Sequence, residues 1–136
     1  MTRSGPPDPR AALVLVPRAL LGTSAAILAV AAFVNRQGNA SGPEIVSWMA
    51  IGFAALAPLL ATAVRGQGLV AAAPTASETP AELALRLQKT IVFFGVLESA
   101  VLFAAVALIV SPPPWPLVAA VLPLAVMALN LPPRQG

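Results

Sequence analysis

The chain has 136 residues and a net charge of +3, and 58% of its residues are hydrophobic while only 10% are charged. Soluble domains carry about 25% charged residues, so this chain has too few charges to cover a soluble surface. Cysteine, histidine and tyrosine are absent, which excludes thiol catalysis, disulfides, the usual zinc sites and histidine-ligated haem. The basic residues are scattered and form no patch with interleaved aromatics, so we expect no nucleic-acid partner. Composition predicts an integral membrane protein without a cofactor that is not an enzyme.

Residues 1–10 form a proline-rich polar arm, which we expect to be disordered and cytoplasmic. The first apolar run, residues 11–34, is long enough to cross a bilayer with a slight tilt, although Pro17 and Arg18 interrupt it. A cleaved signal peptide is the alternative for this run, because a basic start precedes it and small residues lie near its end. The second run, residues 45–64, matches one crossing.

The third helix is predicted to start before the membrane. Thr79 is a typical N-cap, Pro80 suits the first helical position and Glu82 completes a capping box. A helix over residues 80–110 would therefore include a cytoplasmic stem and the apolar run from Ile91. The fourth run, residues 115–131, is short and contains two prolines, and residues 132–136 form a cytoplasmic tail.

The distribution of basic residues predicts the topology. The N-terminal arm, the start of the first run, the second loop and the C-terminus carry seven basic residues, whereas the other two loops carry only Arg36. The seven are Arg3, Arg10, Arg18, Arg65, Arg86, Lys89 and Arg134. Because basic residues collect on the cytoplasmic side, we expect both ends in the cytoplasm. The fold class is therefore all-α: a membrane-embedded four-helix bundle made of two helical hairpins, with spans at about 11–34, 45–64, 80–110 and 115–131.

Small residues at a spacing of four favour close packing of membrane helices. Ala50 with Ala54, and Gly95 with Ser99, have this spacing. In a chain so rich in alanine, the spacing supports close packing but indicates no particular dimer.

Glu98 is the one charged side chain deep within the third run. A carboxylate near the bilayer centre costs about 2.5–3.5 kcal/mol on insertion scales, so it must be paired, protonated or in contact with water. Three interpretations remain open. Glu98 fixes the packing of the bundle, it binds a transported proton or ion, or it contacts another membrane subunit.

Counting from the cytoplasmic ends of the first and third runs places Arg18 and Glu98 at similar depths. An ion pair between them is one expectation, and an Arg18 side chain that extends to the interface is the other. Nearby hydroxyl residues complete a candidate ion-binding cluster with Glu98 and Arg18: Thr23, Ser24, Thr62 and Ser99.

The segment FFGVLESAVLFAAVALIV, residues 93–110, resembles the carboxylate helix of the proteolipid c subunit of rotary ATP synthases. That resemblance implies that Glu98 carries a proton or sodium ion, with Ser99 beside it. The chain departs from this family because residues 45–64 contain a single glycine and because the carboxylate is not in the last helix.

Over most of its length, the chain is similar to small uncharacterised bacterial four-helix membrane proteins. The likeness lies in Gln88, Ile91, Phe103, the Leu97-Glu98-Ser99-Ala100 run and the Pro132-Pro133-Arg134 end. It implies a fold and a bacterial inner-membrane location, which the alanine-, proline- and arginine-rich composition also favours. We therefore expect a non-enzymatic structural or accessory component whose partners are the lipid bilayer, itself or another membrane subunit. A c-subunit-like proton- or sodium-translocating oligomer is the alternative.

Overall fold

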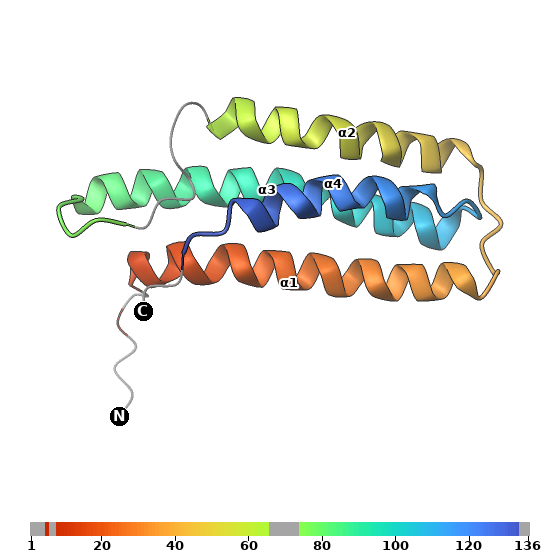
Figure 1. Cartoon of the computed structure of the whole chain (residues 1–136), viewed down its shortest axis with the longest axis horizontal. Coiled ribbons are helices and arrows are strands. Elements are labelled where there is room, and N and C mark those ends of the chain that lie inside the picture. Colours follow the sequence, from red (N-terminus) through yellow and green to blue (C-terminus); the bar gives the residue numbers. More distant parts are fainter. Residues whose placement is uncertain (1–4, 6–7, 66–73, 134–136) are drawn as a thin grey trace.

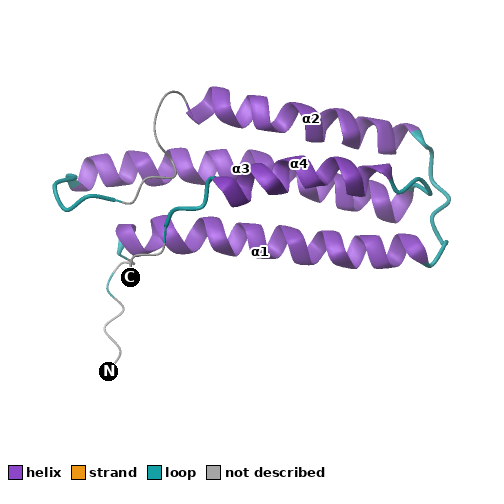
Figure 2. Cartoon of the chain, viewed as in Figure 1, coloured by secondary structure: helices purple, strands orange, loops and turns teal. Residues whose placement is uncertain are grey.

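The computed structural model describes residues 5, 8–65 and 74–133, and within them helices joined by loops are the only secondary-structure elements (Figures 1 and 2). Its four helices are α1 (Pro9–Arg36), α2 (Ile45–Arg65), α3 (Pro80–Val110) and α4 (Trp115–Leu129). The expectation of an all-α chain with four helices is confirmed.

The helix ends follow local capping groups. α1 begins two residues before the expected range because the Asp8 side chain accepts a hydrogen bond from the Arg10 amide and Pro9 occupies a first-turn position. α4 ends at Leu129 rather than at residue 131, and Asn130 is its C-cap. α3 has the bounds expected from the sequence.

The predicted capping box at the start of α3 is confirmed. The Thr79 hydroxyl accepts from the Glu82 amide, and the Glu82 carboxylate accepts from the Thr79 amide at 2.7 Å. The Thr79 amide and hydroxyl both donate to the Glu82 carboxylate, and these two bonds hold the pKa of Glu82 below its usual value. The box fixes the start of the stem, about ten residues before the apolar part of α3.

α3 and α4 each contact all the other helices, whereas α1 and α2 do not contact each other in the described chain. α1 and α3 run in the same direction, and α2 and α4 run in the opposite one (Figure 1). Of the two hairpins expected from the sequence, α3 and α4 pack together, while α1 and α2 are adjacent only along the chain.

Alanine forms much of the helix contact surface. The buried stripe of α2 repeats every three or four residues and consists of Ser47, Ala50, Ala54, Ala57 and Ala61. Such small side chains let helix backbones approach closely where dispersion forces, rather than water exclusion, hold helices together. The larger buried groups, Phe93, Phe94 and Leu97, come from α3. α3 therefore supplies the bulk of the core.

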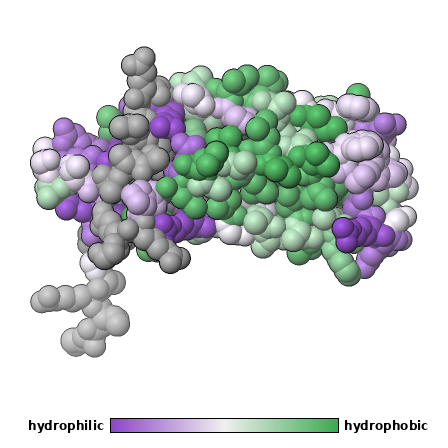
Figure 3. All heavy atoms as spheres, viewed as in Figure 1, coloured by the Kyte–Doolittle hydropathy of each residue, from purple (hydrophilic) through white to green (hydrophobic). Residues whose placement is uncertain are grey.

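An apolar belt covers the middle of the bundle between two polar ends (Figure 3). We call the end that carries the start of α1, the end of α2 and the stem of α3 the termini end. The opposite end, with residues 37–44 and 111–114, is the loop end. α1, α2 and α3 are each long and apolar enough to cross a membrane, whereas α4 is shorter, at 15 residues.

The loop end is fixed by two contacts to the last turn of α3. The Asn35 side-chain amide donates to the carbonyls of Leu108 at 2.7 Å and Ser111 at 3.1 Å. The Gly42 amide donates to the Val110 carbonyl at 2.7 Å. Carbonyls at a helix C-terminus have no partner within the helix, and Leu108 and Ser111 are buried from solvent, so these donors satisfy groups that would otherwise lack a partner.

We expect Gly42→Ala to lower the free energy of unfolding by about 2 kcal/mol, as overpacking of a tight contact does. A β-carbon at position 42 would lie 2.5 Å from the Val110 carbonyl oxygen, so this backbone contact would have to open. Gly52→Ala is the matched control, because a β-carbon there meets no atom within 4 Å. Unfolding in mixed micelles measures the free energy of unfolding of both variants. Equal values for the two variants would contradict the expectation.

Candidate functional site

Glu98 lies within the apolar part of α3, at the border between the buried and exposed faces of the helix. Along the helix surface, its neighbours toward the core are Phe94 and Val101, which are fully buried. Its neighbours on the other side are Gly95, which is half-buried, and Leu102, which is 37% exposed. The carboxylate itself is half-buried.

The border on which Glu98 lies faces α1. Val101 and Ala105, which follow Glu98 by one and two helical turns, belong to one buried cluster with Leu28 and Ala31 of α1 and Ala120 of α4, and α1 is the helix that α3 contacts most extensively. Glu98 therefore lies along the seam between α1 and α3. Among the described residues, no group donates a hydrogen bond to its carboxylate, and no cation forms an ion pair with it.

The Asn35 contacts show why Arg18 is not the partner of Glu98. They join residues 73 and 76 positions apart, so residue n of α1 lies level with about n+73 to n+76 of α3. Arg18 is then level with residues 91–94, about 6–10 Å along the axis from Glu98. The estimate from the sequence placed residue 11 of the first helix level with about residue 90 of the third, which is an offset of about 79. It did so because it counted residues 11–15 as membrane-embedded, whereas these residues lie beside the stem of α3.

Arg18 instead holds the end of α4. Its guanidinium donates to the carbonyl of Pro132 at 2.9 Å. Arg65, at the end of α2, donates to the Asn130 side-chain oxygen at 2.7 Å and lies 5.5 Å from the centre of the Phe93 ring. The two arginines thus bind the C-terminal segment of α4 from α1 and from α2. Sequence reasoning gave Asn130 no role, since nothing local to it indicates a partner 65 residues away.

The predicted hydroxyl residues do not gather around one centre. The Ser99 and Thr62 hydroxyls donate to carbonyls one turn back in their own helices, those of Gly95 and Pro58. Thr62 belongs to α2, which does not contact α1, so it lies apart from the hydroxyl residues of α1.

Two of the predicted residues do lie level with Glu98. By the register of α1 and α3, the positions level with Glu98 are about 22–25, which include Thr23 and Ser24. Thr23 is exposed, whereas Ser24 is fully buried and its hydroxyl has no hydrogen-bond partner among the described residues. The seam therefore brings one carboxylate and two hydroxyl residues to one depth of the belt.

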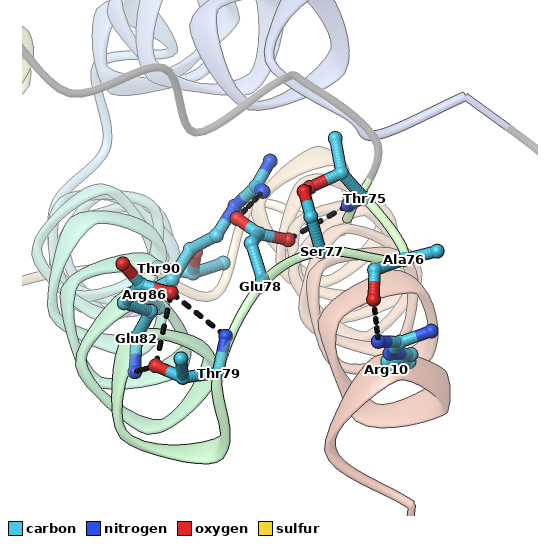
Figure 4. A network of polar contacts seen from close by, with 9 residues as sticks. All are labelled: Arg10, Thr75, Ala76, Ser77, Glu78, Thr79, Glu82, Arg86 and Thr90. Carbon is cyan, nitrogen blue, oxygen red and sulfur yellow. Dashed lines mark hydrogen bonds and ion pairs between the residues drawn. The ribbon is translucent and has the colours of Figure 1, made fainter.

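The charged residues of the termini end form a separate network around the start of α3 (Figure 4). The Arg86 guanidinium donates to the Glu78 carboxylate at 2.7 Å, and both side chains are mostly buried. The second Glu78 oxygen accepts from the Thr75 amide. The sequence analysis counted Arg86 only among the basic residues of the cytoplasmic side, whereas the structure shows that it also fixes the loop before α3.

An open apolar groove lies between α2 and α4 near the loop end. Its lining residues are Trp48, Ile51, Trp115, Val118 and Ala119. The Trp48 indole donates to the Glu44 carboxylate, so its polar edge points to the loop end while its ring borders the groove. Such a placement is typical of aromatic side chains at a membrane interface.

The site offers a limited chemistry. Glu98 can accept hydrogen bonds or bind a cation, but the described residues contain no group of three acidic, histidine or cysteine side chains that could hold a metal ion. Comparisons with family models, with curated proteins and with solved structures found no match for the chain. The assignment of a role to Glu98 therefore rests on its geometry.

We expect Glu98→Leu to raise the free energy of unfolding of the isolated protein by about 1–2 kcal/mol, because it removes a carboxylate without a partner from the apolar belt. Ser99→Leu is the matched control, since it adds the same side chain at the next, exposed position and leaves the carboxylate in place. Unfolding in mixed micelles compares the two. A loss of stability in Glu98→Leu would mean that the carboxylate holds the fold together.

Proposed function

We propose that this chain is a non-enzymatic accessory subunit of a bacterial inner membrane, which binds laterally to another membrane protein through the seam of α1 and α3. The observation that carries the proposal is Glu98, a half-buried carboxylate in the apolar belt for which the described residues provide no partner. Polar groups in membrane helices are costly unless they are paired, so a partner outside this chain accounts for its presence.

Insertion with both ends in the cytoplasm is part of the proposal. Three helices are long and apolar enough to span a bilayer, and the basic residues collect at the termini end. α4 is shorter than the roughly 20 residues of a typical span. Arg18 and Arg65 support a fourth crossing because they bring donors to the end of α4 at the edge of the belt, where their charges reach the headgroups.

The test is purification of the tagged full-length chain from native membranes in lipid-preserving polymer. We expect a membrane protein to co-purify in fixed proportion with the wild-type chain, and Glu98→Gln to reduce its recovery at least about five-fold, because a polar contact between membrane helices has been lost. Glu44→Gln, which alters an exposed carboxylate at the loop end, is the matched control. A chain that purifies as a lone monomer would contradict the proposal.

The c-subunit-like oligomer is the second candidate. An ion carrier must be reachable from outside the protein, and Glu98 is only half-buried, which favours this candidate. Carbodiimide reacts with protonated carboxyl groups in apolar surroundings. If Glu98 carried protons, its labelling in native membranes would rise as pH falls and sodium would not affect it. If Glu98 carried sodium ions, its labelling would also rise as pH falls, but sodium would block it. For the accessory subunit, we expect wild-type Glu98 to resist labelling across pH 5–9 while its partner is bound.

A further inference from the structure

We infer that the protein bound at Glu98 presents a transmembrane helix with an arginine or lysine at the same depth, packed along the seam between α1 and α3. This inference rests on the proposed function and names the chemistry of the partner. A basic side chain complements the carboxylate directly, and charged residues inside membrane proteins characteristically occur in such pairs.

The surface around Glu98 is shaped for a helix to approach. Gly95 lies one turn before Glu98, and a β-carbon there would meet no atom within 4 Å, so the packing of this chain does not require a glycine at that position. Ser99 is exposed, and its hydroxyl is bonded back to the Gly95 carbonyl, which leaves a small surface without a projecting donor. Small residues at this spacing let a second helix come within contact distance, and Glu98 lies directly beside them.

In a second copy of this chain, no basic residue of the described ranges lies level with Glu98. Arg18 is its basic residue nearest to the depth of Glu98, but it lies about 6–10 Å closer to the termini end. Its guanidinium is also directed to the Pro132 carbonyl at the end of α4, whereas Glu98 faces the seam with α1. The other basic side chains of the described residues lie at the two polar ends, which favours a different protein as the source of the cation.

The depth of the expected cation follows from α3. Glu98 is seven residues beyond Ile91, where the apolar run begins, which corresponds to about 10 Å from the termini edge of the belt. A helix that enters the membrane from the same side would carry its basic residue about seven residues inside its own apolar segment.

The experiment uses the full chain, labelled with a donor fluorophore, in vesicles of phosphatidylcholine and phosphatidylglycerol. The probes are acceptor-labelled transmembrane peptides of leucine and alanine, with one arginine seven residues from the cytoplasmic edge or with glutamine in its place. Energy transfer reports association. We expect the arginine peptide to bind the wild-type chain about ten-fold more tightly than the glutamine peptide. We expect this difference to disappear in Glu98→Gln.

Two glycine variants separate a specific seam from general attraction of charges. Gly95→Leu should abolish binding because it fills the surface beside Glu98, and Gly52→Leu on α2 should not. At both positions a β-carbon meets no atom within 4 Å, so the first atom of either new side chain has room. Circular dichroism and thermal unfolding of both variants verify that the fold is kept.

Equal binding of the arginine and glutamine peptides to the wild-type chain would overturn the inference, as would binding that persists in Gly95→Leu. Self-association of the labelled chain that depends on Glu98 and outcompetes the peptides would also overturn it, in favour of a second copy as the occupant. These failures are distinct from failure of the proposed function. A native partner that is lost in Glu98→Gln while the arginine peptide shows no preference would leave the accessory role standing and exclude only the cationic partner.

Discussion

The contact of Asn35 with the last turn of α3 sets the register on which the rest of the molecule depends. It satisfies buried carbonyls that have no partner within α3, and it does so from the last turn of α1. Since α1 and α3 run in the same direction, a fixed alignment at the loop end determines which residues meet along the whole seam. Arg18 is thereby brought to the end of α4, and Glu98 is left level with Thr23 and Ser24.

This register explains why the polar groups of the chain divide as they do. At the termini end, Glu78 is engaged by Arg86 and Glu82 by Thr79, while Arg18 is bound to a backbone carbonyl rather than to a carboxylate. Each of these contacts stabilises a helix end or a loop. Glu98 differs because it makes no hydrogen bond or ion pair within the described chain, and this difference makes it the candidate for a role outside the fold.

Local signals predicted much of the fold and little of the site. The capping box of Thr79 and Glu82 is readable because all its groups lie within four residues, and the apolar runs are readable because their length is a property of composition. The offset between α1 and α3 was not readable, because Asn35 and its acceptors are more than 70 positions apart. Glu98 was identified as unusual because it is a charged residue within an apolar run. That Arg18 does not lie beside it could not be predicted, because this depends on the long-range offset between α1 and α3. Gly42 was missed for the same reason, since only its approach to Val110 requires a glycine.

The lack of contact between α1 and α2 has a consequence for the order of assembly. These helices are synthesised before α3 and are neighbours along the chain, yet in the finished bundle they bury their surfaces against α3 and α4. A nascent chain that ends before Pro80 therefore lacks both helices against which α1 and α2 pack in the finished structure. α3 packs extensively against both of them, so the contacts that join the first two helices into one bundle can form only after α3 has been synthesised.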